Sequence, residues 1–314
     1  MTTASIITIG DELLIGQVID TNSAWMAQEL NKAGIWLKRR VAVGDRWNDI
    51  RKALDEESAA ADIVLITGGL GPTADDITKP LLCEYFHTRL VVNDGALKNV
   101  RHIFESLLKR PMIERNLKQA EVPESCTVIQ NKRGTAPGML FEKEGKVFVS
   151  MPGVPHEMKG MMTDDVIPFL LDKFEMPFIT HRTLLTAGVG ESFLADHIQA
   201  FESTLPENIR LAYLPNYGMV RLRLTGIGND SAHMEPEINA RFSQLKALLE
   251  GRFCTKPVAH WLQVFREAGV PHSAINDYAA ALADGQVEAM GWVREITLPN
   301  GVVTRSFASP LRLD

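Results

Sequence analysis

An apolar run that ends in a cluster of glycines constrains the fold more than any other feature. Residues 63–66 (IVLI) are apolar and mostly β-branched, which is typical of a strand buried in a parallel sheet. The segment 67–79 follows at once and contains Gly68, Gly69 and Gly71. Glycine lets a backbone turn sharply and approach a ligand closely. We therefore expect a strand, a tight bend and a helix in succession.

The helix start after this bend is a candidate anion site. Thr73, Asp75 or Asp76 is available as its cap. Free N–H groups and the positive end of the helix dipole favour a bound phosphate. Two neighbouring carboxylates in such a loop favour a metal ion or a proton-transfer role. The simpler alternative is a tight turn with a capping aspartate.

Length and composition limit the class of protein. With 314 residues the chain is long enough for two domains and a third small one. The net charge of -6 argues against general nucleic-acid binding. No segment is apolar over the length of a membrane span, and residues 1–6 enter a strand without a basic leader, so we expect a cytoplasmic protein. Three cysteines far apart, Cys83, Cys126 and Cys254, favour reduced thiols.

Successive strand–helix units predict an α/β fold with a doubly wound, mostly parallel sheet. Strands are expected at residues 5–10, 37–43 and 63–66, with helices at 24–33, at 48–60 and ending near 86. Polar residues follow the first two strands: Asp11, Glu12, Asp20 and Asn22 after the first, and Asp45 after the second. Ligands bind at the carboxyl ends of strands in such sheets. For any one of these residues the alternative is surface turn chemistry.

The rest of the chain predicts one more strand–helix unit, a small domain and a tail. Helices are expected at 95–109 and 112–120, strands at 128–129 and 146–150, and a helix from Pro155 to about 174. A β-α-β-β-α order follows, at 180–187, 190–201, 209–213, 219–225 and 231–249, with a turn at 215–218. It predicts a second, small α+β domain. The tail is expected to form two helices and a hairpin over Asn300-Gly301.

Four stretches resemble the CinA family, competence/damage-inducible protein A. They are residues 7–14 with 20–23, 67–79, 134–138 (GTAPG) and 151–158 (MPGVPHEM). The resemblance implies a molybdopterin-binding (MoaB/Mog-like) domain at 1–175 and a small KH-type domain at 176–251. For some family members it also implies a metal-dependent ADP-ribose pyrophosphatase. For the KH-type domain of this acidic chain, a dimerisation or scaffold role is favoured over RNA binding, and we expect a homodimer.

The resemblance also suggests roles for individual residues. Asp76 matches the functional aspartate after the glycine loop of the molybdopterin-binding relatives, and Asp45 matches their second one. Asp45 and Asp76 are therefore expected as catalytic residues and metal ligands, and Asp11, Glu12 and Glu157 are the next candidates for a metal or base role. Lys79, one turn into the helix, is the third expected catalytic residue, because its charge would offset developing negative charge. The expected substrate-binding residues lie on the same loops: Gly10, Asp11, Glu12, Asn22, Ser23, Gly68, Gly69, Gly71, Thr73, Gly134, Thr135, Pro137, Gly138, Gly153 and Glu157.

Several of these residues, and Arg133 as well, have a structural alternative. Lys79 could equally be a solvated lysine on a helix face, and Asn22 or Ser23 could simply cap the helix at 24–33. Arg133 contacts phosphate or only extends along the surface.

Hard oxygen ligands favour Mg²⁺ or Mn²⁺, with Co²⁺ and K⁺ as further candidates. The expected activity is hydrolysis of ADP-ribose to AMP and ribose 5-phosphate. A non-hydrolytic pterin- or nucleotide-binding module and an assembly scaffold with a vestigial pocket are the alternatives.

Residues 252–314 depart from the family pattern. Long CinA proteins continue into a nicotinamide-nucleotide deamidase domain, and the roughly sixty residues here are too few for one. Segments 261–271, 275–284 and 309–313 instead resemble a late part of family III CoA-transferases. The catalytic aspartate of that family lies upstream of this part, so no CoA transfer is implied. A natural fusion, an engineered chimera and an assembly artefact all fit, and we expect the tail to dock on the small domain or on a partner chain.

Overall fold

A computed structural model describes residues 2–73, 76–187, 189–216, 219–253, 255–267, 269, 274 and 277–307. Some predictions lie outside the described residues: Asp75 as a cap, the turn at Tyr217-Gly218, the thiol of Cys254 and parts of the CoA-transferase-like segments. Contacts divide the chain into two units. The first unit contains Met1–Arg182, Pro206–Arg210 and Leu224–Ala240. The second unit contains Thr183–Leu205, Leu211–Arg223 and Arg241–Asp314. The domain boundaries at 175 and 251 stay predictions. No helix within the described ranges is long and apolar enough to cross a lipid bilayer.

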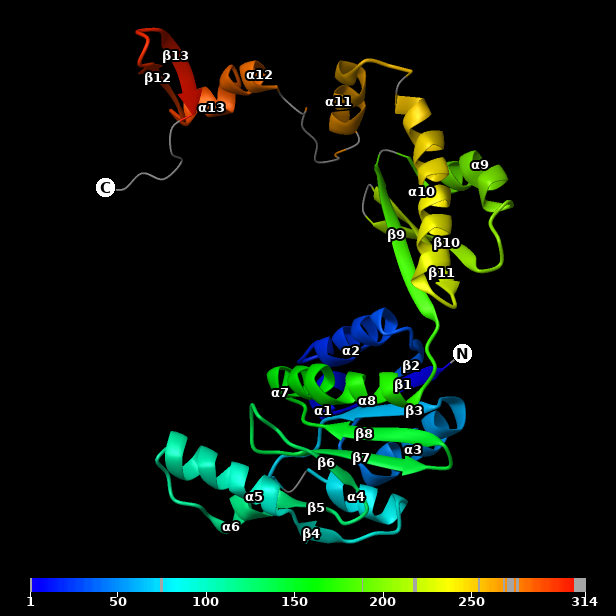
Figure 1. The fold of residues 1–314 in the computed structure, drawn as a ribbon, viewed down its shortest axis with the longest axis vertical. Helices are drawn as coiled ribbons and strands as arrows, with labels where there is room; N and C mark the ends of the chain where they lie inside the picture. The colour runs from blue at the N-terminus through cyan, green and yellow to red at the C-terminus, as the bar shows by residue number, and fades with distance from the viewer. Residues whose placement is uncertain are drawn as a thin grey trace. The chain divides into compact units, whose positions relative to one another are not determined.

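The first unit contains a six-stranded sheet with the strand order β2-β1-β3-β8-β7-β6 (Figure 1). Its strands are β1 (Thr3–Ile9), β2 (Trp36–Val43), β3 (Ile63–Thr67), β6 (Thr127–Ile129), β7 (Gly138–Lys143) and β8 (Lys146–Met151). Strands β2, β1, β3 and β8 are parallel, whereas β7 is antiparallel to both β8 and β6. All of β3 and most of β1 are buried, as expected for consecutive apolar residues in the middle of a parallel sheet. The mostly parallel α/β fold is confirmed.

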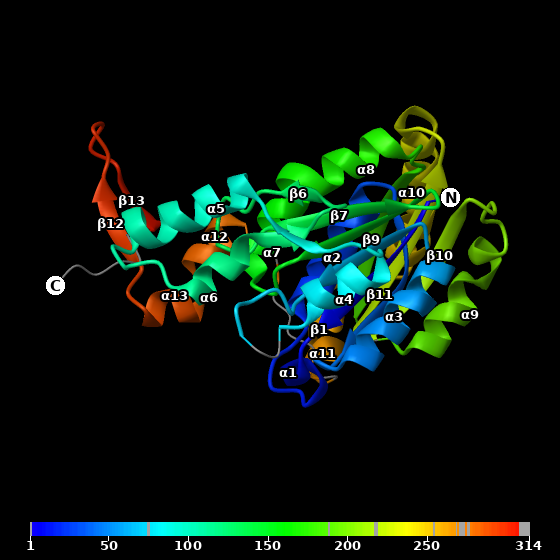
Figure 2. The same ribbon diagram turned by 90° about the horizontal axis from the view of Figure 1, so that it is seen from below.

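Helices cover both faces of this sheet. They are α2 (Thr21–Lys32), α3 (Trp47–Ala60), α4 (Thr78–Tyr85), α7 (Pro155–Met161) and α8 (Ile167–Lys173), the last two joined by a π-helical turn at Met162–Val166. The short helix α1 (Asp11–Leu14) follows β1 and has no buried residue. Figure 1 shows α2, α7 and α8 on one face, where Leu30, Met158 and Leu170 pack on the strands. Helices α3 and α4 lie on the other face, with Leu54 and Leu82, and they are in front of the sheet in Figure 2. The two apolar layers keep the strand ends in fixed positions.

The connection between β3 and β8 is more irregular than the sequence predicts. After α4 it contains β4 (Leu90–Val92), α5 (Asp94–Arg101), a π-helix (His102–Leu107), α6 (Glu114–Leu117), a 3-10 turn (Lys118–Ala120) and β5 (Glu121–Pro123), with β4 and β5 antiparallel. The helix expected at 95–109 is therefore α5 followed by a π-helix. Strand β7 was not predicted. A two-residue turn joins it to β8, with Glu144 at φ 52° and Gly145 at φ 76°.

The small α+β domain has the predicted element order. Its elements are β9 (Phe178–Ala187), α9 (Glu191–Glu202), β10 (Ile209–Asn216), β11 (Met219–Gly228) and α10 (Ser231–Phe253), with sheet order β10-β11-β9. The tail contains α11 (Val258–Glu267), α12 (Tyr278–Leu282), α13 (Gly285–Ala289), β12 (Val293–Thr297) and β13 (Val303–Phe307). Strands β12 and β13 form the expected antiparallel hairpin, and Gly301 has φ 81° in its turn. The additional short helix is the difference from the prediction.

Candidate functional site

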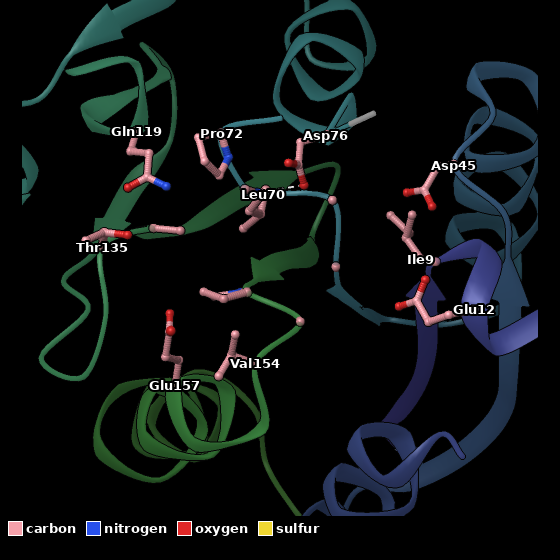
Figure 3. Close-up of a pocket in the computed structure, with 17 residues that line it drawn as sticks. Ile9, Glu12, Asp45, Leu70, Pro72, Asp76, Gln119, Thr135, Val154 and Glu157 are labelled. Atoms are coloured by element: carbon pink, nitrogen blue, oxygen red, sulfur yellow. Dashed lines mark hydrogen bonds between the residues drawn. The ribbon is translucent and has the colours of Figure 1, made fainter. Parts of the chain in front are cut away.

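A cavity of about 430 Å³ lies at the carboxyl ends of β1, β2, β3 and β8 (Figure 3). Many of the residues predicted for the site line it: Gly10, Glu12, Asp45, Gly68, Gly69, Gly71, Asp76, Thr135, Gly153 and Glu157. The four loops selected from the sequence thus meet at one place, because parallel strands present their carboxyl ends at the same edge of the sheet. Gln119, Leu70, Pro72 and Val154 also line the cavity and were not predicted. Gln119 comes from the irregular connection, where no sequence motif marks it.

The glycine bend after β3 allows close backbone packing. Gly68 has φ 112° and Gly69 has φ 64°, values that favour glycine. A Cβ atom on Gly68 would overlap the carbonyl oxygen of Ile9, at the end of β1. The Gly68 amide donates to the carbonyl of Met151, at the end of β8, over 3.1 Å. The bend therefore holds three strand ends together, and the Gly68 N–H serves the fold rather than a phosphate.

Asp76 closes the second half of the glycine loop. Its carboxylate accepts from the amides of Gly71 and Thr73, each over 2.8 Å, and from the Thr73 hydroxyl over 2.5 Å. The predicted role of Asp76 or Thr73 as a helix cap is wrong, because α4 begins only at Thr78 and its first turn has no side-chain cap. Figure 3 shows the Asp76 carboxylate at the cavity wall. One charged group thus shapes the loop and faces the cavity.

Asp45 and Glu12 supply two more carboxylates on the same wall. The Asp45 carboxylate accepts from the Asp11 amide over 3.0 Å, and the Asp45 amide donates to the Asp11 carboxylate over 3.3 Å. Asp11 itself does not line the cavity. Glu12 lies over Gly10, where a Cβ atom would come within 2.5 Å of a carboxylate oxygen. Asp45 and Glu12 therefore face the ligand space, and Asp11 supports Asp45 from behind.

The predicted roles of Asn22 and Ser23 change in the structure. Helix α2 is capped by Asp20, which accepts from the Ser23 amide over 2.9 Å, so neither Asn22 nor Ser23 is the cap. The buried Ser23 hydroxyl donates to Asp20, and Ser23 lines neither the cavity nor the smaller hollow beside it. Asn22 donates to the carbonyl of Gly153 over 2.7 Å and lines a second hollow of about 120 Å³. Asn22 is thus placed beside the main cavity, with which this hollow shares Gly153 and Glu12.

Lys79 does not reach the cavity, contrary to its predicted role in neutralising charge. It is only 7% exposed, and its ammonium group donates to the carbonyl of Gln119 over 2.9 Å. Burial lowers the pKa of Lys79 to about 8, although the carboxylates of Glu121 and Asp76 partly oppose that effect. Lys79 therefore ties α4 to the segment that carries Gln119.

The loop at 131–138 packs on Glu157 from α7. The buried Asn131 donates to the Glu157 carboxylate over 2.6 Å, and a Cβ on Gly134 would overlap that carboxylate. Burial raises the pKa of Glu157, while the Asn131 hydrogen bond and the charge of His156 act the other way. Neither Pro137 nor Gly138 lines the cavity, and Gly138 is a buried residue at the start of β7. Arg133 forms an ion pair with Asp164 at 3.4 Å and does not line the cavity.

The oxygen donors of the cavity are compatible in type with a hard divalent cation. Among the described residues, no group of three or more His, Cys, Asp or Glu side chains is gathered as a metal cage. Mg²⁺ commonly binds through one or two carboxylates plus substrate phosphates and waters, so such a cage is not required. Asp45 and Asp76 line one cavity and offer oxygen donors of this type. Cys83 and Cys126 are free thiols, and neither lines this cavity.

Comparisons with known proteins agree with this architecture. Residues 5–172 match the family described as "Probable molybdopterin binding domain", which defines the class of the first domain. Residues 181–253 match "Damage-inducible protein CinA KH domain", and residues 221–314 match "CoA-transferase family III". The chain belongs to the CinA-like protein family, as its four loop motifs predict. The CoA-transferase-like match also supports the resemblance seen in the tail, although it begins earlier than residue 252.

Individual relatives show how far the similarity extends. A CinA-like protein of Flavobacterium psychrophilum is 48% identical over 246 residues, which are 78% of this chain and 59% of the relative. A CinA-like protein of Cytophaga hutchinsonii is 46% identical over 247 residues, 79% of this chain and 59% of the relative. The chain thus spans about three fifths of the length of these curated relatives. CinA from Thermoplasma acidophilum, known from a crystal structure, is 31% identical in sequence. The match covers 55% of this chain and 98% of the Thermoplasma chain, with a TM-score of 0.48.

Proposed function

We propose that the first domain is a metal-dependent hydrolase of a nucleotide-sugar pyrophosphate, with ADP-ribose as substrate and AMP and ribose 5-phosphate as products. One observation carries the proposal: carboxylates from three separate strand ends, Glu12, Asp45 and Asp76, line a single cavity with glycine bends. Its volume of about 430 Å³ lies within the range of ordinary small-molecule sites. A concentration of negative charge around a site for an anionic substrate is expected when a cation binds with the substrate.

The roles of the protein groups follow from their positions. Asp45 and Asp76 would hold a Mg²⁺ or Mn²⁺ ion, and Co²⁺ is a further candidate. When bound, such an ion polarises the phosphoryl oxygens and favours ionisation of a water molecule. The glycine bends admit the diphosphate close to the backbone, and Thr135 and Gly153 line the same cavity. Asn22, fixed on the Gly153 carbonyl, is placed to contact the sugar or base in the neighbouring hollow.

A non-hydrolytic binding module is the second candidate. The amides of Gly71 and Thr73 are committed to Asp76, so this part of the loop does not offer them to a phosphate. That geometry fits a site that holds a pterin or nucleotide by shape and by the remaining loops. An assembly scaffold with a vestigial pocket is the third reading of the same site.

One assay separates the three candidates. The full chain is incubated with ADP-ribose and Mg²⁺, Mn²⁺ or Co²⁺, with EDTA as a control, and AMP and ribose 5-phosphate are measured. The hydrolase proposal expects metal-dependent product formation that Asp76→Ala and Asp45→Asn reduce at least 100-fold. Tight ADP-ribose binding without turnover would replace it with the binding module, and the absence of both would leave the scaffold.

A further inference from the structure

Glu157 occupies a different part of the cavity from the other carboxylates. Figure 3 shows Glu157 and Thr135 on one side, and Glu12 and Asp45 on the other. Glu157 comes from the first turn of α7, whose path is set by Pro155. A carboxylate on the wall away from the proposed metal ligands is available for proton transfer.

Asn131 fixes the orientation of this carboxylate. Its side-chain nitrogen donates to Glu157 Oε2 over 2.6 Å and to the carbonyl of Ala136 over 2.9 Å, and its side-chain oxygen accepts from the amide of Arg133 over 3.0 Å. A carbonyl can only accept and a backbone amide can only donate, so these two partners determine which end of the Asn131 amide faces Glu157. Asn131 is 2% exposed, and its backbone carbonyl accepts from the Asn99 side chain over 2.8 Å. The donor that faces Glu157 is therefore held from several directions.

This arrangement leaves Glu157 Oε1 as the oxygen that can receive a proton. Asn131 donates to Oε2, so this oxygen already has a hydrogen-bond partner. The Gly134 backbone packs beside both oxygens, which leaves no room for a side chain there. The half-buried carboxyl group has a raised pKa, because burial outweighs the Asn131 hydrogen bond and the charge of His156. A carboxyl group shifted towards neutral pH is a more effective proton acceptor than an exposed one.

In the part of the chain that the structure describes, the charged groups near Glu157 lie on α7, on the 131–138 loop and on the other cavity loops. His156 is its neighbour on α7. On the 131–138 loop, Lys132 and Arg133 are directed to Asp164, at 3.9 and 3.4 Å. The carboxylates of Glu12, Asp45 and Asp76 line the same cavity on other loops. Among the described residues, Asn131 is the group whose side chain donates a hydrogen bond to the Glu157 carboxylate, so a change of Asn131 should alter the titration of Glu157 most.

We propose that Glu157 is the general base that takes a proton from the attacking water, and that Asn131 is the positioning residue that holds Glu157 for this step. The inference rests on the proposed hydrolase function. The water O–H bond breaks as its oxygen bonds to one phosphorus, and the proton passes to Glu157 Oε1. The bond from that phosphorus to the bridging oxygen breaks, and the second phosphate leaves with the electron pair. The other water proton stays on the new phosphate until it ionises in solution.

The test compares pH profiles of ADP-ribose hydrolysis by the full chain and three variants. Glu157→Gln keeps the shape but cannot take the proton, so kcat should fall by about 100-fold or more while KM changes less than about threefold. It should also lose the acidic limb of the kcat/KM profile. Asn131→Asp cannot donate to Glu157 and adds negative charge, so the acidic limb should move to higher pH by about one unit. Lys132→Ala, a change of an exposed residue on the same loop, should leave the profile unchanged.

An NMR titration of Glu157, which needs no substrate, accompanies the kinetics. With ¹³C-labelled glutamate, the Glu157 side-chain signal is assigned by its loss in Glu157→Gln, and its titration midpoint should be higher in Asn131→Asp than in the wild type. Wild-type turnover with an unchanged kcat and acidic limb in Glu157→Gln would overturn this inference and leave the hydrolase function intact. Absence of wild-type turnover with every metal would overturn the hydrolase function itself. Should Asn131→Asp fail to fold, the Glu157→Gln profile decides alone.

Discussion

Asp11 and Asp45 hold each other through reciprocal hydrogen bonds: each backbone amide donates to the carboxylate of the other residue, at 3.0 and 3.3 Å. This clip joins the loop after β1 to the loop after β2. Only Asp45 lines the cavity, so Asp11 affects a ligand through the position of Asp45. A residue chosen from the sequence as a substrate contact is thus a support for a neighbouring carboxylate.

We expect Asp11→Ala to weaken the proposed metal site without unfolding the protein. It removes the acceptor of the Asp45 amide, and an exposed hydrogen bond contributes about 1 kcal/mol or less to stability. The Mn²⁺ concentration at half-maximal ADP-ribose hydrolysis should rise roughly threefold to tenfold, since about 1 kcal/mol is worth a factor of about five. Asp11→Asn keeps an acceptor oxygen and should restore the wild-type value. Equal damage from both variants would show that the charge of Asp11, rather than the hydrogen bond, is what matters.

Asp76 should prove essential to the shape of its loop. Asp76→Ala removes the acceptor of the Gly71 and Thr73 amides, so we expect the free energy of unfolding to fall by about 1–2 kcal/mol in urea titrations. Hydrogen exchange of these two amides should become at least about tenfold faster. Thr73→Val loses only the hydroxyl contact and serves as the control, with both amides still protected. Unchanged exchange in Asp76→Ala would contradict the loop-closing role.

Replacement by alanine should destabilise the protein strongly at Gly68 and hardly at all at Gly153. In Gly68→Ala the new methyl group overlaps the Ile9 carbonyl in a backbone with φ 112°, so the loss of stability should be on the order of 3 kcal/mol. At Gly153 the nearest atom to a new Cβ is 3.5 Å away, so the free energy of unfolding of Gly153→Ala should lie within about 0.5 kcal/mol of the wild-type value. Its methyl group would still enter the cavity and should raise the KM for ADP-ribose. Similar unfolding curves for the two variants would refute this account of the bend.

Lys79 should make stability depend on pH in the alkaline range. The folded protein binds this proton less tightly than the unfolded chain, because burial lowers the pKa from 10.5 to about 8. Between these values the unfolded state carries more protons, so the free energy of unfolding contributed by Lys79 rises with pH. Relative to Lys79→Met, the wild type should gain about 3 kcal/mol between pH 7 and pH 10.5. The exposed Lys118, changed to Met, should give a curve parallel to the wild type, and a parallel curve for Lys79→Met would contradict the burial effect.

The sequence was most informative where one physical effect dominates. The apolar run at β3 and the glycines after it predict a buried strand and a sharp bend, and both are present because only such residues satisfy a central parallel strand and a backbone at positive φ. The meeting of distant loops followed from the direction of the strands alone.

Side-chain partners were harder to predict, because they depend on three-dimensional neighbours. Asp76, Asp20 and Ser23 are all plausible caps by type, and only the folded loop shows that Asp20 caps α2 while Asp76 binds Gly71. Lys79 is a typical surface residue by type, yet the connection from β4 to β5 covers it. The sequence signal for β7 is weaker: two apolar runs flank Glu144-Gly145, and Gly145 can adopt the positive φ that a two-residue hairpin turn requires.

The central claim is that Asp45 and Asp76 hold a cation against a diphosphate within one cavity. The most direct measurement is the anomalous scattering of Mn²⁺ in a crystal of the full chain soaked with Mn²⁺ and a non-hydrolysable methylene analogue of ADP-ribose. We predict a Mn²⁺ peak within bonding distance of the Asp45 and Asp76 carboxylates and of the analogue's diphosphate. A diphosphate bound elsewhere, or a Mn²⁺ peak away from both carboxylates, would contradict the claim.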